Sequence, residues 1–188
     1  MILTPATTRD VPRLLRFRTD AAAWLSQLGT DQWSTSYPEE SILGSVQAGE
    51  VFVLRAAPGA DLAATITLDT FGDPLLWTEA ERSQPARYVH KLTVDRAFKG
   101  LSLGSQLLDW AGTVASSNGC TWLRLDAWTT NASLHRYYQG LGFAHIRTVH
   151  DPETGGSGWV AQRPAVETGF GFVDQTGLIN RCRESKGG

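Results

Sequence analysis

The hydrophobic and polar positions at the start of the chain follow two different periods. Residues 2–4 form a short apolar run that predicts a strand, and apolar residues then recur every three or four positions over 11–28, which predicts an amphipathic helix. A polar and aromatic stretch, 30–37, separates this helix from a second one expected over 38–48, which begins with Pro-Glu-Glu. Two helices joined by such a loop are suited to line a pocket.

The next apolar runs have the length and spacing of a β-hairpin. Residues 51–55 and 63–68 are aliphatic and β-branched, and the connection 57–61 contains proline and glycine. Residues 70–87 show no regular period, so we expect irregular chain there.

The middle of the chain reads strand, loop, helix, strand. Residues 88–94 predict a strand, 101–117 a helix and 122–127 a second strand, so these two strands are expected to be parallel neighbours. A helix capped by Asn131 follows and reaches Leu141.

The last part of the chain predicts one more pair of strands. These strands, 143–150 and 158–162, flank the glycine-rich turn 154–158. The tail from Pro164 is rich in glycine and predicts no element.

Length and charge limit the function classes. The chain has 188 residues and a mass of 20.5 kDa, which fits one domain. The 17 basic and 19 acidic residues give a net charge of −2, which offers no electrostatic reason to bind nucleic acid. No apolar run approaches the roughly 18 residues of a membrane span, and the start lacks the layout of a signal peptide. Cys120 and Cys182 have no metal-ligand spacing and are too few for a disulfide framework, so we expect a cytoplasmic protein without a metal.

Residues 94–106, VDRAFKGLSLGSQ, connect a predicted strand directly to a helix. Such a loop presents backbone N–H groups and the positive end of a helix, which suits an anion. Gly100 and Gly104 would let the backbone approach a phosphate, while Arg96 and Lys99 add positive charge. Glycine is also common there simply as a turn residue. The spacing matches neither the G-x-x-x-x-G-K-[ST] loop nor G-x-G-x-x-G, which disfavours ATP and NAD.

Residues 99–104 resemble motif A of the GNAT superfamily of acyl-CoA-dependent N-acyltransferases, whose pattern is [Q/R]-x-x-G-x-[G/A]. Lys99 stands where the family has Gln or Arg and keeps the charge. Ser102 stands where the family has its first Gly, and its Cβ would crowd the pyrophosphate unless its hydroxyl acts as a donor. Gly104 agrees with the pattern.

A second motif supports the resemblance. The segment 131–143 is similar to the family's closing signature N-x-x-A-x-x-x-Y-x-x-x-G-F, with Asn131, Tyr138 and Phe143 at matching positions. The order of elements also agrees over about residues 2–163. The resemblance implies a mixed α/β fold of the α+β kind over residues 1–165. Its mixed sheet would have about six to seven strands, including a parallel splayed pair, and about four flanking helices. Residues 166–188 would form an extension of unknown role.

The resemblance also assigns contacts with acetyl-CoA by position. It implies that the backbone of Leu92, Thr93 and Val94 hydrogen-bonds the pantetheine arm, and that one of these N–H groups, at Leu92 or Val94, polarises the thioester carbonyl. Asn131 would contact the same arm, although it is equally suited to be a helix N-cap, and both roles can hold together. The pyrophosphate would lie on the N–H groups of a continuous run, namely Lys99, Gly100, Leu101, Ser102, Leu103, Gly104 and Ser105.

Tyr138 matches the tyrosine that donates a proton to the leaving thiolate in many relatives. A phenol pKa of about 10 keeps this group protonated at neutral pH. The alternative is an aromatic core residue on an amphipathic helix. The neighbouring Tyr137 points elsewhere, so the spacing favours Tyr138.

Two residues are candidates for the proton transfer from the amine. His90 is the titratable group of strand 88–94 with an ordinary pKa near neutrality, so we expect it to act as general base, through water if necessary. Asp126 is the alternative, as a group that orients the amine or a water. Both residue types also occur in purely structural roles, as a satisfied strand histidine and a loop-capping carboxylate.

The acceptor contacts are expected from Asp31, Trp33 and Tyr37 in the loop between the first two helices, together with residues 75–86 and Trp128. An aromatic and acidic lining suits a small cationic amine. The alternative for Trp33 is an anchor in the core.

These observations predict an N-acetyltransferase that works by direct attack in a ternary complex, because neither cysteine lies in a nucleophile motif. The acceptor is expected to be a small-molecule primary amine, and the protein a monomer or homodimer. Two alternatives stay open: acetylation of a peptide or protein at its N-terminus or a lysine, and a non-catalytic module that binds or senses acyl-CoA.

Overall fold

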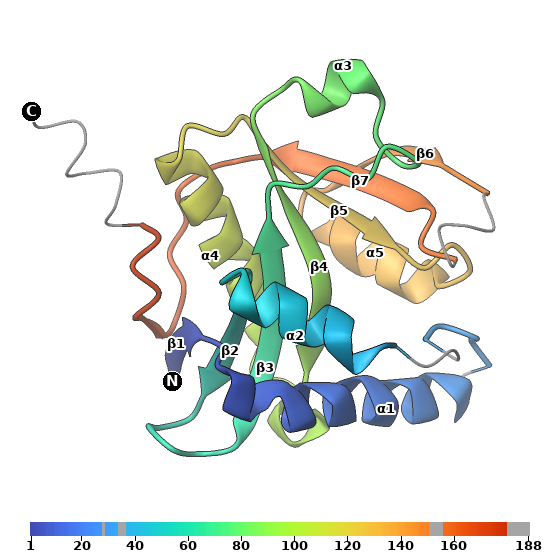
Figure 1. Cartoon of the computed structure of the whole chain (residues 1–188). Coiled ribbons are helices and arrows are strands. Elements are labelled where there is room, and N and C mark those ends of the chain that lie inside the picture. Colours follow the sequence, from blue (N-terminus) through green and yellow to red (C-terminus); the bar gives the residue numbers. More distant parts are fainter. Residues whose placement is uncertain (28, 34–36, 151–155, 180–188) are drawn as a thin grey trace, which may run out of the picture.

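The computed structural model describes residues 1–27, 29–33, 37–150 and 156–179. Its centre is one mixed sheet with the strand order β6-β7-β5-β4-β3-β2-β1-β8 (Figure 1). The strands are β1 (Ile2–Pro5), β2 (Val51–Arg55), β3 (Leu62–Asp69), β4 (Ala86–Val94), β5 (Trp122–Ala127), β6 (Ala144–Thr148), β7 (Trp159–Pro164) and β8 (Val173–Asp174). The helices are α1 (Val11–Gln27), α2 (Glu39–Gln47), α3 (Glu79–Arg82), α4 (Leu103–Ser117) and α5 (Ala132–Gly140).

The helices cover both faces of the sheet, and β2 shows how its side chains serve both. Phe52 and Leu54 pack on the face that α4 and α5 cover, whereas Val51 and Val53 pack against α1 and α2. This division follows from the alternation of side chains along a strand, and it explains why the whole run reads as apolar. The expected mixed α/β fold is confirmed.

Two short elements were not expected from the sequence. The strand β8 pairs in parallel with β1, with Ile2 opposite Val173, and it adds one strand to the expected six or seven. The described part of the extension, residues 166–179, runs along α4, where Thr113 exchanges hydrogen bonds with Thr168 and the Trp110 indole donates to Asp174 at 3.1 Å.

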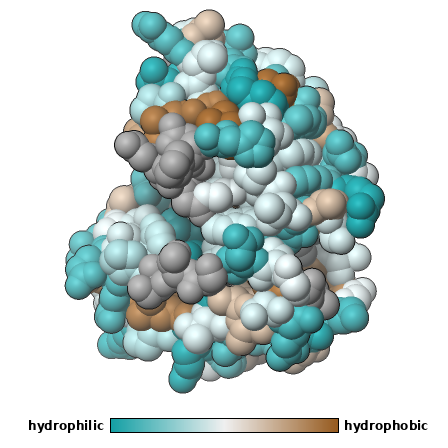
Figure 2. Space-filling model, turned by 90° about the vertical axis from the view of Figure 1, so that its right-hand side faces the viewer, coloured by the Kyte–Doolittle hydropathy of each residue, from teal (hydrophilic) through white to brown (hydrophobic). Residues whose placement is uncertain are grey.

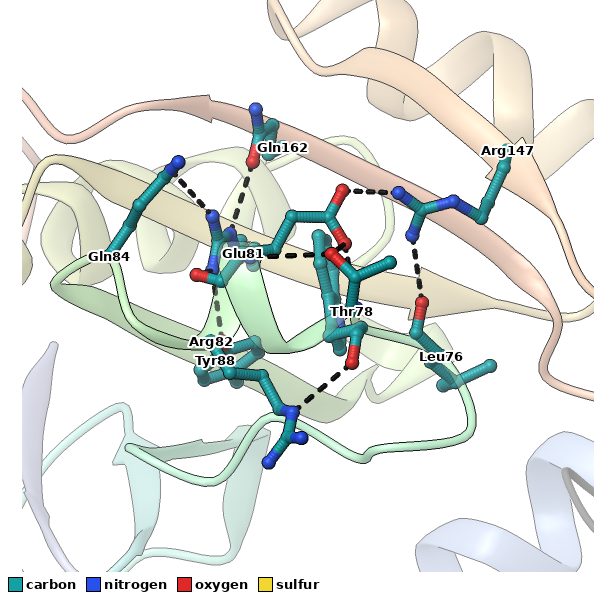
Figure 3. A network of polar contacts seen from close by, with 10 residues as sticks. Leu76, Thr78, Glu81, Arg82, Gln84, Tyr88, Arg147 and Gln162 are labelled. Atoms are coloured by element: carbon teal, nitrogen blue, oxygen red, sulfur yellow. Dashed lines mark hydrogen bonds and ion pairs between the residues drawn. The ribbon is translucent and has the colours of Figure 1, made fainter.

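The helix α3 lies in the stretch expected to be irregular, and Arg124 of β5 attaches this loop to the sheet. Figure 3 shows Glu81 and Gln84 of the loop beside Tyr88 and Gln162 of the sheet. The Arg124 side chain is fully buried and donates four hydrogen bonds. They reach the carbonyl oxygen of Glu81 at 2.6 Å, the Tyr88 hydroxyl at 3.0 Å, Gln84 Oε1 at 3.1 Å and Gln162 Oε1 at 3.0 Å. The loop 70–85 therefore covers the part of the sheet that α1 and α2 leave open.

The two parallel strands at the centre separate halfway along their length. β4 and β5 pair from Ala86 opposite Trp122 to Val89 opposite Leu125, and no pairing follows. Beyond Val89, β4 continues only along β3. The expected parallel splayed pair is thus confirmed, and the β5-facing backbone of residues 90–94 has no strand partner.

A β-bulge lies in the separated part of β4. Thr93 pairs with Thr65 and His90 pairs with Thr67, so β4 advances by three residues over an interval in which β3 advances by two. Lys91 lies in this interval and has a φ of 50°, a left-handed conformation that is uncommon for a residue other than glycine.

Candidate active site

A cleft of about 1210 Å³ opens where β4 and β5 separate. Residues from both faces of the sheet line it, including Phe17 of α1, His90 and Asp126 at the separation point, and Tyr138 of α5. The cleft therefore passes through the sheet and connects its two faces. Seen from the side where the α1–α2 and β6–β7 loops lie, the surface is mostly hydrophilic, with hydrophobic residues in separate patches (Figure 2).

Residues 96–105, which the sequence predicts to hold an anion and which we call the anion cradle, connect β4 to α4 beside the cleft, and Arg96 and Lys99 of this segment line it. The Asp95 carboxylate accepts a hydrogen bond from the N–H of Ala97 at 2.8 Å and begins the short turn that precedes the cradle. α4 begins at Leu103, and within the described residues the N–H groups of Leu103, Gly104 and Ser105 have no hydrogen-bond partner. The N–H of Lys99 donates to the carbonyl oxygen of Arg96 at 3.1 Å. The first turn of α4 thus supplies the free donors.

Ser102 and Gly104 show why the cradle favours glycine. Ser102 lies in the left-handed region, with φ 54° and ψ 28°, so it occupies the conformation that glycine adopts without cost. A Cβ on Gly104 would come within 2.7 Å of the Tyr137 hydroxyl oxygen. The Ser105 hydroxyl donates to the carbonyl oxygen of Ser102 at 2.8 Å.

At the separation point, the imidazole of His90 bridges two carboxylates. Nδ1 lies 3.3 Å from Asp126 Oδ1, and Nε2 lies 3.4 Å from Asp69 Oδ2. Burial alone would lower the pKa of His90, but Asp126 and Asp69 raise it to about 10. At neutral pH the imidazole is therefore protonated, and this Asp-His-Asp cluster (Asp69, His90, Asp126) carries a net charge of −1.

The two tyrosines of α5 both line the cleft. Tyr138 is 7% exposed and packs against Phe143 and Trp159, whereas Tyr137 is 41% exposed and lies beside the cradle at Gly104. Burial raises the pKa of the Tyr138 phenol well above its ordinary value, and Tyr137 and Asp126 add to the shift. The Tyr138 phenol is therefore protonated at neutral pH, which is the form that can donate a proton.

Hydrogen bonds connect the loop after α1 with the start of α5 across one end of the cleft. The Trp128 indole donates to Asp31 Oδ1 at 2.7 Å, and the Asn131 amide donates to Gln32 Oε1 at 2.7 Å. Asn131 Oδ1 accepts from the N–H of Leu134 at 3.0 Å, which confirms Asn131 as the N-cap of α5. The carboxylate of Asp31 and the indole of Trp128 thus bind each other.

Trp33 and Tyr37 line the cleft as expected, but the groups beside them are cations. The Arg18 guanidinium lies 4.8 Å from the centre of the Tyr37 ring and 5.3 Å from that of Trp33. The Lys91 ammonium also lies 4.8 Å from the centre of the Tyr37 ring. The expected acidic lining is therefore not found at these two aromatic residues. Residues 75–86 contribute no described lining residue.

Sequence reasoning missed Asp69, Arg18 and Lys91. Asp69 reaches His90 only because β3 and β4 pair in the register that the structure shows, which no local motif encodes. Arg18 and Lys91 carried no signal beyond their charge. Leu92, Thr93 and Val94, which the sequence did single out, all line the cleft.

Within the described ranges, no three His, Cys, Asp or Glu side chains are placed to hold a metal ion. Asp69 and Asp126 contact opposite nitrogen atoms of His90 and do not converge on one point. No helix in the described part of the chain has the length and apolar composition that a membrane crossing requires.

Comparison with known proteins shows similarity to acetyltransferases. A family model described as the acetyltransferase (GNAT) family matches residues 18–143. The uncharacterised N-acetyltransferase YesJ of Bacillus subtilis (strain 168) is 31% identical over 145 residues, which span 74% of this chain and 79% of YesJ.

Solved structures share the fold at lower identity. A GNAT-family acetyltransferase from Listeria monocytogenes 4b F2365 superposes with a TM-score of 0.71 at 23% identity, over 86% of this chain and 93% of that one. The PaiA N-acetyltransferase from Thermoplasma acidophilum, solved in complex with coenzyme A, gives a TM-score of 0.65 at 14% identity, over 86% of this chain and 97% of that one.

Proposed function

Because the chain belongs to the GNAT family of acetyltransferases, and is thus an acetyl-CoA-dependent acyltransferase, we propose that it acetylates the primary amine of a small molecule. One observation carries the proposal. The cleft at the separation of β4 and β5 has an anion cradle on one side of the sheet and a carboxylate cluster on the other. A phosphate-bearing acyl donor and an amine can therefore approach the same point from opposite faces.

The donor side accounts for acetyl-CoA as a substrate. The pyrophosphate lies on the free N–H groups at the start of α4, with Lys99 near it in the cleft lining. The pantetheine arm follows the unpaired backbone of Leu92, Thr93 and Val94, where it takes the place of a strand partner. Asn131 contacts this arm as well as capping α5. A backbone N–H of β4, at Leu92 or Val94, points to the thioester carbonyl oxygen.

The acceptor side of the cleft attracts and binds the amine. The Asp-His-Asp cluster has a net charge of −1, so it attracts the ammonium form of the acceptor. His90 already holds a proton at neutral pH and acts by fixing the two carboxylates. Asp126, at the separation point, is the group that accepts the hydrogen bond from the amine and takes its proton during attack.

The reaction is a direct transfer. The bound ammonium first loses one proton to water. The neutral amine nitrogen then attacks the thioester carbonyl carbon, and the resulting oxyanion accepts a hydrogen bond from the β4 backbone. The carbon–sulfur bond then breaks, the thiolate takes the phenolic proton of Tyr138, and the proton lost by nitrogen passes to Asp126. No covalent intermediate with the enzyme forms. We place the reaction in the cytoplasm, where the protein is a monomer or homodimer.

The contacts at one end of the cleft favour a small acceptor over a peptide. Gln32 and Asn131, which both line the cleft, join two loops there, and the exposed Asp31, which does not line it, joins the same loops through Trp128. A peptide acceptor would need an open groove there, so the bridge supports a molecule that fits within the cleft.

The test is thiol release from acetyl-CoA across a panel of primary amines, with CoA binding measured separately by isothermal titration. We expect CoA to bind at micromolar concentration and at least one small amine to be acetylated. Gly104→Leu, which fills the cradle, should abolish CoA binding while circular dichroism shows an intact fold, and His150→Gln at an exposed position serves as control. Binding of CoA without turnover of any amine would favour a sensing module, and turnover confined to peptides would refute the small acceptor.

A further inference from the structure

Two cations lie on the acceptor side of the cleft and have no part in the proposed reaction. Arg18 comes from α1, and Lys91 comes from the bulge of β4. Both line the main cleft, and both lie 4.8 Å from the centre of the Tyr37 ring. We call them the cationic pair.

Lys91 is held in place by unusual backbone. It lies in the interval where β4 has one residue more than β3, with a φ of 50°. Among the described residues, no carboxylate oxygen lies within 4.0 Å of its ammonium group. A left-handed backbone conformation at a lysine costs conformational free energy that a regular strand would avoid. The geometry therefore maintains a positive charge at this point of the cleft.

Arg18 brings a second positive charge to the same ring. Burial lowers the pKa of its guanidinium, which reflects the low polarity of its surroundings, although arginine stays protonated at any physiological pH. Arg18 thus adds a second positive charge to the lining that it shares with Lys91.

A small cavity lies next to the cationic pair. Its volume is about 40 Å³. Apolar residues, including Leu14, Ile42 and Val51, form most of its lining, and its polar groups come from Arg18, Lys91, Ser45 and the threonines Thr65, Thr67 and Thr93. The cavity shares six lining residues with the main cleft, namely Phe17, Arg18, Trp33, Tyr37, Lys91 and Thr93. A space of this size holds one small polar group, since a single water takes about 30 Å³ in the liquid.

The negative and positive subsites are neighbours on the same strand. His90, which joins the two carboxylates, directly precedes Lys91, and both residues line the cleft. An acceptor that places its ammonium at Asp126 can therefore place an anion beside Lys91 without being a long molecule. A planar carboxylate matches both the forked donors of Arg18 and the small cavity better than the larger phosphate group does.

We propose that the acceptor carries a carboxylate close to its primary amine, as an α-amino acid or similarly small zwitterion does, and that Arg18 and Lys91 bind this carboxylate. The inference rests on the proposed amine acetylation and narrows its acceptor class. It also replaces the expected cationic amine, because a second ammonium group in place of the carboxylate would meet the cationic pair.

The first test compares matched acceptors in the thiol-release assay. Each of a set of L-amino acids is assayed beside its carboxamide and its decarboxylated amine, for example L-leucine, L-leucinamide and isoamylamine. We expect kcat/KM to be at least about tenfold higher for a zwitterion than for its two partners, which corresponds to one charge-assisted contact. Equal or better turnover of the uncharged partners or of polyamines would overturn the inference and leave the acetyltransferase function standing. A preference for O-phosphoethanolamine over all carboxylates would overturn the choice of carboxylate.

The second test uses variants of the cationic pair. Lys91→Met and Arg18→Gln should each raise KM for the best amino acid by about tenfold or more and leave kcat within about threefold. The loss of kcat/KM should be at least about tenfold larger for the amino acid than for its decarboxylated partner. Arg16→Gln is the matched control, because Arg16 is exposed on the same helix and lines neither cavity. An equal loss for both members of a pair would mean a merely structural role and would refute the inference.

A binding measurement separates this inference from the proposed function. If no amine is acetylated, the acetyltransferase proposal fails, and titration of the CoA-bound protein with the same matched compounds still tests the carboxylate site. Binding of an amino acid that Lys91→Met abolishes would support the site. Absence of binding by every amino acid would overturn it.

Discussion

Replacing His90 with glutamine should flatten the dependence of folding stability on pH in the alkaline range. The imidazole lies 3.3 Å from Asp126 and 3.4 Å from Asp69, its side chain is 24% exposed, and its pKa is raised to about 10. The unfolded chain should titrate this group near its ordinary value of about 6.5. The folded state therefore binds the proton more tightly than the unfolded state.

The sign and size of the effect follow from linkage. Because the pKa of His90 is higher in the folded state, its contribution to stability is complete below about pH 6.5 and disappears as the pH rises through about 10. Each pKa unit corresponds to 1.36 kcal/mol, so this group should reduce the free energy of unfolding by about 1 kcal/mol per pH unit between pH 7 and pH 9. The whole loss over that range is about 2 kcal/mol. The His90→Gln variant lacks this component.

The measurement is the free energy of unfolding from urea titrations at pH 6, 7, 8 and 9 for the wild type and two variants. The difference between the wild type and His90→Gln should shrink as the pH rises, while His150→Gln, with its exposed side chain, should follow the wild type throughout. The other titrating groups cancel in this comparison, provided that they are undisturbed. Parallel curves for the wild type and His90→Gln would show that the carboxylates do not hold the proton, and would refute the reasoning.

Three further substitutions test the donor side and the scaffold. Tyr138→Phe removes the proposed proton donor and should lower kcat by about 100-fold with little change in the Kd for acetyl-CoA, and an unchanged kcat would contradict the assignment. Ser102→Gly removes a side chain from a left-handed conformation and should raise the free energy of unfolding, measured by urea titration, by up to about 1 kcal/mol. CoA binding should be kept or tightened. A loss of stability would argue against strain at this residue. Arg124→Met deletes four buried hydrogen bonds and should lower the free energy of unfolding by about 2–4 kcal/mol, whereas Arg16→Met should change it little. A loss below about 1 kcal/mol for Arg124→Met would mean that other contacts hold the loop 70–85.

The parts of the fold that the sequence predicted are those with a long, regular pattern. The unit of β4, α4 and β5 has apolar residues that repeat over many positions. The predicted order of strand, helix and strand was therefore correct. α3 and β8 are four and two residues long, too short for a period to develop. Tertiary contacts produce them: Arg124 fixes the loop that contains α3, and pairing with β1 defines β8.

The same distinction applies to the site. The anion cradle is one continuous segment, so its glycines and its position before a helix were visible in the sequence. The Asp-His-Asp cluster joins three strands, and only two of its members were singled out. Asp69 joins them because the register of β3 against β4 places it beside His90. Register depends on which faces are buried across the whole sheet, and no short motif records it.

The bulge in β4 decides which charges meet the acceptor. In a regular strand, the side chains of His90 and Lys91 would point to opposite faces of the sheet, because neighbouring side chains alternate. In the structure, Lys91 lines the small cavity together with Thr67, the residue of β3 that pairs with His90, and the extra residue and the positive φ at Lys91 occur at this interval. The break in alternation thus sets the negative cluster next to the cationic pair. The sequence alone does not predict this specificity, because His90 and Lys91 in a regular strand would present their charges on opposite faces of the sheet and would form a different site.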